Sequence, residues 1–270
     1  MTEKLYEPLP DIDAYLERIG IAQAQSPTEE FLDELIDAHQ HAVPFEDLDV
    51  YELRQSPSLG IADLFDKIVT RKRGGYCFEL NALFNALLKA LGYETQPTMG
   101  RVLIRPIPHP FVTHRANIVT IGEARYLADV GFGGPMPSFA PRIEDGAMRT
   151  ERGQTFTLHR FDDYWWEVGF TGENHVDWRV LRFCEMPQQE HDFVPLSFYQ
   201  AQNPESAFRL HRMANIKTAD GANDLRDSTY TEFRNGQKTS WEVEDDALDE
   251  LLAEKFGIAN WQGAAKENAS

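Results

Sequence analysis

The chain has 270 residues, 42% of them hydrophobic, which is enough to bury a large core in one elaborate domain or in two to three small ones. Its formal net charge of −18 argues against a nucleic-acid partner and against binding to an anionic membrane surface. No stretch approaches the roughly eighteen apolar residues of a membrane span, and two cysteines are too few for a disulfide framework or for a zinc site built on cysteine.

Helical patterns fill the first third of the chain. Asp11 is placed to cap a short helix that ends near Arg18. Residues 26–29, Ser-Pro-Thr-Glu, have the spacing of a capping box with proline in the first turn, and an apolar helical face follows them. A second amphipathic helix is predicted over residues 61–69, before a pair of glycines at 74–75.

A cysteine lies just beyond that glycine pair. From Leu80 to Leu91 the apolar residues recur with the spacing of one buried helical face, and Gly92 is a natural stop. Cys77 should therefore lie in the first turn of this helix, where free backbone N–H groups and the helix dipole favour a thiolate. A cysteine in such a place can have a pKa well below about 8.5, and the thiolate is the nucleophile. The alternative is a small side chain buried under the helix.

Two further residues complete a candidate catalytic set. His114 begins a β-branched run typical of a strand, Gly122-Glu123 indicates a turn, and Asp129 lies in the next apolar strand. Residues some fifteen apart on antiparallel strands can lie side by side. A carboxylate in an apolar strand needs a partner, and an imidazolium at His114 would provide one. We therefore predict a triad in which His114 takes the proton of Cys77 and Asp129 orients His114.

Strand signals dominate from about residue 95 to residue 186, and such a run usually closes into a barrel or packs as a sandwich. The expected strands lie at residues 101–105, 116–120, 126–130, 155–161, 164–170 and 178–183. The last third is mixed. It contains the strongest hairpin signal of the chain, Asn235-Gly236 between runs at 229–233 and 239–243, and a final helix over 246–256.

Three segments resemble the signature blocks of the arylamine N-acetyltransferase family: RGGYCFELN at 73–81, THRANIV at 113–119 and DVGFGG at 129–134. The block PFEDL at 44–48 resembles another, although the family usually has Asn where this chain has Asp47. The resemblance implies an α+β fold with a core similar to that of cysteine proteases and transglutaminases. It further implies a helical bundle carrying the nucleophile, an antiparallel β-barrel carrying the histidine and aspartate, and a smaller α/β lid. The changes of pattern along the chain place the boundaries independently near residues 92 and 190, which gives units at 1–92, 93–190 and 191–270.

The resemblance also implies a reaction. An acyltransferase of this family would move an acetyl group from acetyl-CoA through a Cys77 thioester to an arylamine or arylhydrazine nitrogen, with ping-pong kinetics. Two alternatives remain open: an amide synthase of the same family that acts on a polyketide-like thioester, and a thiol hydrolase of transglutaminase-like type. The resemblance implies cofactor contacts at Thr113, Gly131, Phe132 and Gly133, and acceptor contacts at Phe45, Phe132 and Phe208.

The glycine-rich loop at 131–134 has two interpretations from its residues alone. Glycines after a strand permit a tight turn. A loop without bulky side chains directly after the triad aspartate also lets a thioester cofactor approach the backbone, whose N–H groups can donate to phosphates. The loop matches neither the dinucleotide-binding nor the P-loop pattern.

Coenzyme A is an anion and the protein is acidic, so binding of this cofactor requires local positive charge. A basic rim is predicted from Arg71, Lys72, Arg73, Arg101, Arg105 and Arg115. Cys184 lies in a strand-like stretch without a base nearby, and we interpret it as structural. Glu79 and Asn81 are candidates to hold either Arg73 or the loop.

The remaining predictions concern partners and location. The histidines lack paired metal-ligand spacing, so no metal is predicted. The first residues lack the charged-then-apolar plan of a signal peptide, and we expect a cytoplasmic protein. We expect a small-molecule amine or hydrazine acceptor, no nucleic-acid or membrane partner, and a monomer or homodimer.

Overall fold

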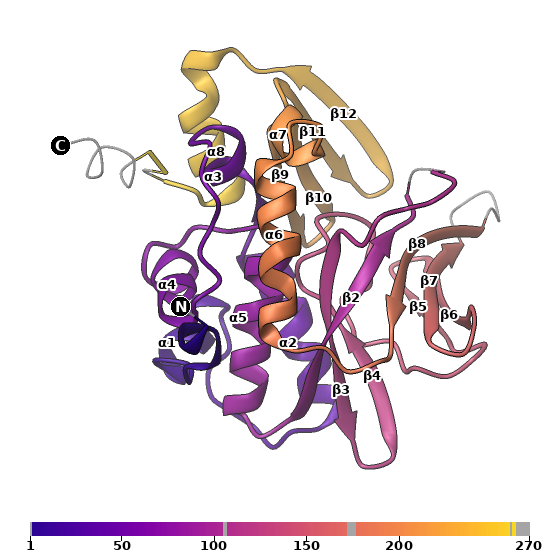
Figure 1. Cartoon of the computed structure of the whole chain (residues 1–270). Helices are drawn as coiled ribbons and strands as arrows, with labels where there is room; N and C mark the ends of the chain where they lie inside the picture. Colours follow the sequence, from indigo (N-terminus) through magenta and orange to yellow (C-terminus); the bar gives the residue numbers. More distant parts are fainter. Residues whose placement is uncertain (1, 105–106, 172–176, 260, 263–270) are drawn as a thin grey trace.

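The computed structural model describes residues 2–104, 107–171, 177–259 and 261–262, and it mixes helices with two antiparallel sheets (Figure 1). Helices gather on one side of the molecule, the larger sheet on the other, and the smaller sheet above them. The helical elements are η1 (Glu3–Tyr6), α1 (Ile12–Arg18), α2 (Glu29–Ala42), α3 (Leu48–Tyr51), α4 (Ile61–Phe65), η2 (Asp66–Thr70), α5 (Cys77–Ala90), η3 (Glu190–Asp192), α6 (Phe193–Gln202), α7 (Ala207–Leu210), η4 (Asp245–Ala247) and α8 (Leu248–Phe256).

Two helix starts test the capping predictions. Asp11 caps α1, since its Oδ1 accepts a hydrogen bond of 3.0 Å from the N–H of Ala14, as expected. The capping box at 26–29 is placed wrongly, because Thr28 is the N-cap of α2 and its hydroxyl accepts from the N–H of Phe31 at 3.3 Å. Pro27 therefore precedes the helix instead of occupying its first turn.

The helix predicted over 61–69 forms as two elements in one continuous segment. The α-helical part, α4, passes into η2, a π-helical turn with wider i→i+5 spacing. Lys67, Ile68 and Val69 of η2 are all buried. A lysine is thus turned toward the interior at this point.

The larger sheet has seven strands in the order β4-β3-β2-β8-β7-β6-β5, all antiparallel. The smaller sheet has the order β1-β9-β10-β11-β12, also antiparallel. The strands are β1 (Phe45–Glu46), β2 (Glu94–Val102), β3 (His114–Ile121), β4 (Ala124–Ala128), β5 (Met148–Glu151), β6 (Gln154–Arg160), β7 (Trp165–Thr171), β8 (Asp177–Cys184), β9 (Met213–Thr218), β10 (Gly221–Arg226), β11 (Thr229–Arg234) and β12 (Gln237–Glu242).

The expected closed barrel is corrected to a curled, open sheet. Strands β4 and β5 stand at its two ends, and no ladder joins them within the described ranges. The expected strand at 101–105 is also shifted, because β2 begins at Glu94 and contains Pro97. A proline has no N–H group to donate to a neighbouring strand. At Pro97, β2 has a paired strand on one side only, because β3 pairs with it there and β8 pairs with β2 at residues 100–102. Residue 105 lies outside the described residues.

The C-terminal hairpin is confirmed. Asn235 and Gly236 both have positive φ angles, 50° and 78°, as a type I′ turn requires, and β11 and β12 pair across them. The final helix is also found, as η4 followed by α8, and it ends at the left-handed Gly257.

Two contacts join regions that the sequence analysis assigned to different domains. Strand β1, from the first ninety residues, pairs with β9 of the C-terminal sheet. Phe193 and Ala201 of α6 belong to the same hydrophobic core as α5. The division near residues 92 and 190 stays a prediction.

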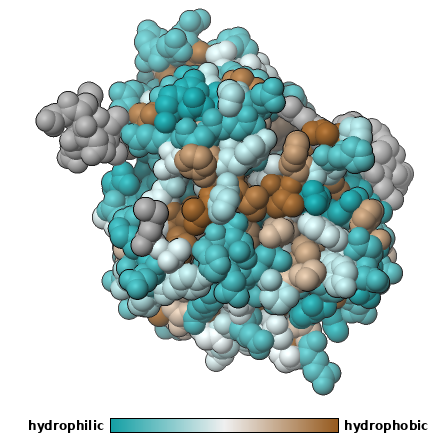
Figure 2. Space-filling model, viewed as in Figure 1, coloured by the Kyte–Doolittle hydropathy of each residue, from teal (hydrophilic) through white to brown (hydrophobic). Residues whose placement is uncertain are grey.

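The largest hydrophobic core surrounds α5, which is buried along almost its whole length. Polar side chains cover most of the face shown in Figure 2, and apolar ones gather in a band across its middle. Helix α6, at the front of the same view in Figure 1, exposes Phe198 and Tyr199. Within the described ranges, no helix is long and apolar enough to cross a membrane.

His39 is an unusual member of this core. Its ring is fully buried between Tyr15 and Phe84, with centroid distances of 6.0 and 5.5 Å, and neither ring nitrogen has a hydrogen-bond partner in the described part of the chain. Burial, assisted by the charge of Arg18, lowers the pKa of His39 from 6.5 to about 3. The folded protein therefore holds His39 neutral at pH values where the unfolded chain would protonate it.

The free energy of unfolding should fall as the pH drops below about 6.5, because protons then favour the unfolded state. One such histidine lowers the free energy of unfolding by about 1.4 kcal/mol for each pH unit between its pKa in the unfolded chain and its pKa in the folded protein. His39→Phe should remove this part of the slope, as judged from urea unfolding at pH 7.5 and pH 5. His41→Gln, a change at a partly exposed position, is the control. An unchanged slope in His39→Phe would contradict the assignment.

Candidate active site

Cys77 is the first residue of α5, as predicted. The preceding Tyr76 is the N-cap, and its backbone N–H donates to Oε2 of Glu79 at 3.1 Å. Cys77 is only 2% exposed, and its Sγ lies 3.7 Å from the backbone oxygen of Thr113. The nucleophile candidate thus sits in a capped first turn and faces the segment that leads into β3.

His114 and Asp129 meet at the ends of two paired strands. His114 is the first residue of β3, and Asp129 follows the last residue of β4 instead of lying inside the strand. The register pairs Asn117 with Ala128, so the two functional residues fall at the same end of the ladder. Their side chains are joined by a hydrogen bond of 2.7 Å between Nε2 and Oδ2, and both are buried.

The electrostatics of His114 suit a proton carrier. Burial by itself lowers the pKa of His114, but the carboxylate of Asp129 and a hydrogen bond with Cys77 outweigh it and raise that pKa to about 10. Because Nε2 is engaged by Asp129, the other ring nitrogen is left for Cys77. The structure therefore brings together the three residues that the sequence analysis grouped.

Asn81, one turn beyond Cys77 on α5, supports the aspartate. Its Nδ2 donates to Oδ1 of Asp129 at 2.9 Å, and its Oδ1 accepts from the N–H of Val130 at 3.0 Å. The N–H of Gly131 donates to the same Oδ1 of Asp129 at 2.9 Å. The sequence left open whether Asn81 holds Arg73 or the loop, and it holds the loop.

The glycine-rich loop packs closely against the nucleophile helix. A Cβ atom at Gly131 would lie 3.0 Å from the Cα of Cys77 and 2.9 Å from Nδ2 of Asn81. Gly133 has a φ of +68°, and a Cβ there would lie 2.6 Å from the ring of Phe45. These two positions need glycine so that the loop can approach α5 and turn over Phe45.

One of the three predicted acceptor residues contacts the triad, and the other two contact each other. The ring of Phe132 lies edge-on to His114 at 5.3 Å between centroids. Phe208 of α7 contacts Phe45 at 6.1 Å and Tyr76 at 5.4 Å. Tyr76 is an aromatic neighbour that the sequence analysis did not single out, and its adjacency to Cys77 was the available signal.

Lys217 of β9 is a second residue that the sequence analysis missed. It lines a pocket with Phe45 and Phe132, and its Nζ donates to the backbone oxygen of Met136 at 2.6 Å and to Oγ of Ser138 at 2.8 Å. Burial lowers the pKa of Lys217 to about 8. It ties the C-terminal sheet to the segment after the glycine-rich loop, and no local pattern indicates this distant contact.

Asp47 connects β1 to β9, and it stands where the family that the sequence resembles usually has Asn. Its Oδ1 accepts from the N–H of Met213 at 2.8 Å, and its own N–H donates to the backbone oxygen of Met213 at 3.2 Å. Oδ2 is buried without a hydrogen-bond partner within the described ranges. Burial raises the pKa of Asp47 well above its usual range.

The predicted basic rim is wrong for two of its members. Arg73 and Arg115 are buried, and they pair with Glu46 at 2.7 Å and with Glu190 at 2.6 Å. Their charges are matched inside the protein and do not face a ligand. Arg71 pairs with Asp66, Arg101 lies over the ring of Trp165, Lys72 is exposed, and Arg105 lies outside the described residues.

Cys184, the second cysteine, has a structural environment. Cys184 is buried at the end of β8, and its backbone oxygen accepts a hydrogen bond from the hydroxyl of Thr98. Within the described ranges, no group of three or more His, Cys, Asp or Glu residues could hold a metal ion.

Comparison with known proteins places this geometry among enzymes of one kind. A family model described as N-acetyltransferase matches residues 29–261. The arylamine N-acetyltransferase of Escherichia coli (strain K12) is 32% identical over 255 residues, which cover 92% of this chain and 89% of that protein.

Solved structures agree. The arylamine N-acetyltransferase of M. tuberculosis superimposes with a TM-score of 0.88 at 30% identity, covering 96% of this chain and 97% of that one. The Mycobacterium marinum arylamine N-acetyltransferase in complex with CoA superimposes with a TM-score of 0.85 at 30% identity, covering 92% and 93%.

Proposed function

The chain belongs to the arylamine N-acetyltransferase family, and on that basis we propose that it transfers the acetyl group of acetyl-CoA through a thioester on Cys77 to an arylamine or arylhydrazine nitrogen. One observation carries the assignment of the residues. Sγ of Cys77 lies 3.7 Å from the backbone oxygen of Thr113, the residue directly before His114, and Nε2 of His114 is held by Asp129 at 2.7 Å. This is the arrangement that activates a thiol as a nucleophile.

The proposed reaction has two halves. In the first, His114 holds the proton of the Cys77 thiol, and the thiolate sulfur attacks the carbonyl carbon of acetyl-CoA. The bond from that carbon to the sulfur of coenzyme A breaks, and the departing thiolate takes the proton from His114. In the second half, the amine nitrogen attacks the Cys77 thioester, His114 takes the amine proton, and the Cys77 thiolate leaves.

Two features support these steps. The raised pKa of His114 favours the imidazolium, which can hold the thiol proton until the departing coenzyme A thiolate takes it. Asp129 fixes the ring so that the nitrogen facing Cys77 exchanges this proton. We propose the backbone N–H of Cys77, in the first turn of α5, as a donor to the developing oxyanion.

The substrate contacts are proposed from neighbouring geometry. Thr113, whose backbone oxygen lies beside Sγ of Cys77, and the loop at 131–133 would contact the thioester end of acetyl-CoA. The CoA complex of the M. marinum relative supports coenzyme A as the carrier. Phe45, Phe132 and Phe208 would form apolar walls for an aromatic acceptor.

The division into domains, the cellular location and the oligomeric state are also proposals. We propose a helical unit over 1–92, a sheet unit over 93–190 and a lid over 191–270, with a core like that of cysteine proteases and transglutaminases. Supply of the nucleophile by a helix and of the base by a sheet supports this layout. We propose a cytoplasmic enzyme, monomeric or dimeric, that does not bind nucleic acid.

Initial-rate kinetics test the function. Acetyl-CoA and an arylamine are varied together, and we expect parallel double-reciprocal lines, because coenzyme A leaves before the amine attacks. Added arylamine should speed the steady release of coenzyme A, since water is the poorer acceptor. A release rate that does not change with amine concentration would identify a hydrolase and contradict the proposal.

A further inference from the structure

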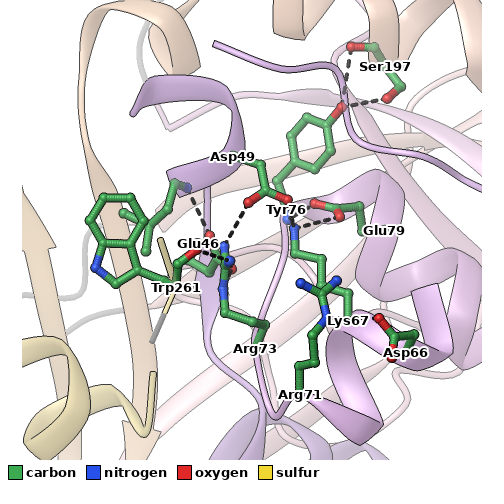
Figure 3. A network of polar contacts seen from close by, with 11 residues as sticks. Glu46, Asp49, Asp66, Lys67, Arg71, Arg73, Tyr76, Glu79, Ser197 and Trp261 are labelled. Carbon is green, nitrogen blue, oxygen red and sulfur yellow. Dashed lines mark hydrogen bonds and ion pairs between the residues drawn. The ribbon is translucent and has the colours of Figure 1, made fainter. Parts of the chain in front are cut away.

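Five charged side chains meet in the interior beside the start of α5 (Figure 3). They come from β1, α3, η2, the segment before α5, and α5 itself: Glu46, Asp49, Lys67, Arg73 and Glu79. Three are carboxylates and two are cations, and all but Asp49 are almost wholly buried. Burial of so many charges is costly, so each must be paired with good geometry.

Lys67 is the member that links this cluster to the nucleophile. Its Nζ lies 2.7 Å from Oε1 of Glu79 and 2.7 Å from Oδ2 of Asp49. The other oxygen of Glu79, Oε2, accepts the N–H of Tyr76, the residue directly before Cys77. A short chain of contacts therefore runs from the ammonium group to the backbone that presents the thiol.

The far side of the cluster is anchored independently. Arg73 donates from Nη2 to Glu46 at 2.7 Å and to Asp49 at 2.9 Å, and from Nη1 to the backbone oxygen of Trp261 at 3.3 Å. Asp49 is thus held in place by Arg73 without Lys67. Glu79 has Lys67 as its cationic partner, so a change at Lys67 acts mainly on Glu79.

The carboxylate of Glu79 also packs directly against the backbone before α5. A Cβ atom at Gly75 would lie only 2.8 Å from Oε2 of Glu79. The position of this oxygen and the path of residues 75–77 therefore determine each other. A shift of Glu79 would move the first turn of α5, and with it Sγ of Cys77.

The charge of Glu79 depends on its surroundings. Burial raises the pKa of Glu79 to about 7, Lys67 opposes this rise, and the neighbouring carboxylates add to it. The titratable and charged groups around it are Lys67 of η2, Asp49 of α3, Glu46 of β1, Arg73, and Tyr76 and Cys77 at the start of its own helix. An ionised carboxylate accepts the N–H of Tyr76 more strongly than a neutral carboxylic acid does.

We propose that Lys67 is a positioning residue for acylation of the thiol: it holds Glu79 as the cap of Tyr76, so that the first turn of α5 presents Cys77 to His114. The proposal rests on the proposed role of Cys77 as nucleophile. Lys67 touches neither substrate nor reacting atoms and acts through Glu79.

The test compares Lys67→Met, Lys67→Arg and the double variant Lys67→Met/Glu79→Gln with the natural protein. Two rates are measured: alkylation of Cys77 by iodoacetamide, followed by peptide mapping, and release of coenzyme A in the first turnover. Lys67→Met should slow both by about 10- to 100-fold, since a shift of about 1 Å in a reacting group has effects of that size. Lys67→Arg should stay within a few fold, because it keeps the charge.

The double variant separates positioning from lost packing. Gln at position 79 accepts the N–H of Tyr76 without needing a counter-charge, so most of both rates should return. Lys89→Met, at a half-exposed lysine near the other end of α5, is the matched control and should react as the natural protein does. Circular dichroism checks the fold of every variant.

The pH dependence of the first-turnover rate distinguishes positioning from a purely structural role of Lys67, because a structural role would not shift it. In the natural protein the first-turnover rate should fall as the pH drops through about 7, where Glu79 takes up a proton. Lys67→Met should move this limb to higher pH, and Glu79→Gln should abolish it. If Lys67→Met does not fold, the test rests on Glu79→Gln. A first-turnover rate that still falls near pH 7 in Glu79→Gln overturns the proposal.

The proposal is also overturned if Lys67→Met folds and still reacts at the natural rate, whether or not it loses thermal stability. Its failure can be told apart from failure of the proposed function, since alkylation does not require acetyl transfer. Suppose that iodoacetamide alkylates Cys77 faster in the natural protein than in Lys67→Met, but that the natural protein forms no acetyl-enzyme. Positioning by Lys67 is then supported, and the proposed function is contradicted.

Discussion

Asp129→Asn is expected to slow acetylation of Cys77 by about 10⁴-fold, the loss that the corresponding change causes in a serine-protease triad, while the fold is retained. Oδ2 of Asp129 accepts the proton of His114 Nε2, and Oδ1 accepts from Asn81 and Gly131. An asparagine would keep its oxygen toward those two donors and turn its NH₂ group toward His114. The imidazole proton would then move to the nitrogen that faces Cys77, which could no longer accept the thiol proton.

Single-turnover release of coenzyme A measures this effect directly. The matched control is Asp163→Asn, in the turn between β6 and β7, which should react as the natural protein does. A loss smaller than about tenfold in Asp129→Asn, with the fold intact by circular dichroism, would show that Asp129 does not set the tautomer.

His114→Ala is expected to remove the acetyl-enzyme almost completely, by about 10⁴-fold or more in rate, because the thiol loses its only proton acceptor in the proposed mechanism. Truncation also leaves a cavity beside Cys77, since the ring is buried. Imidazole added to the buffer should enter that cavity and restore part of the rate. The measurement is the yield of acetyl-enzyme with time, with and without imidazole.

His159→Ala, on β6 of the same sheet, controls for general effects of losing a histidine. Near-normal acylation in His114→Ala would mean that another group takes the proton. That result would contradict the triad even if Cys77 is the nucleophile.

The nucleophile could be predicted from sequence because its signals are local. A glycine pair, a cysteine and a 3.6-residue apolar period lie within twenty residues, and they place Cys77 at the first position of α5. His114 and Asp129 were reachable because one short turn connects their strands, so spacing alone brings them together.

The rest depends on contacts that sequence spacing does not encode. Lys67 lies inward in η2, a π-helical turn that no regular helical period predicts, and Glu79 pairs with Lys67 instead of Arg73. Lys217 reaches Met136 and Ser138 from a distant strand. Whether the seven strands close into a barrel depends on the meeting of β4 and β5, which no local pattern specifies.

Mass spectrometry of the enzyme after mixing with acetyl-CoA, in the absence of any amine, tests the central claim most directly. We predict that about one equivalent of coenzyme A is released per active site in a burst, and that one acetyl group is found on the peptide that carries Cys77. Addition of an arylamine should then discharge this acetyl group. Absence of the acetyl-enzyme, together with intersecting double-reciprocal lines, would mean direct transfer in a ternary complex and would contradict the role of Cys77 as nucleophile.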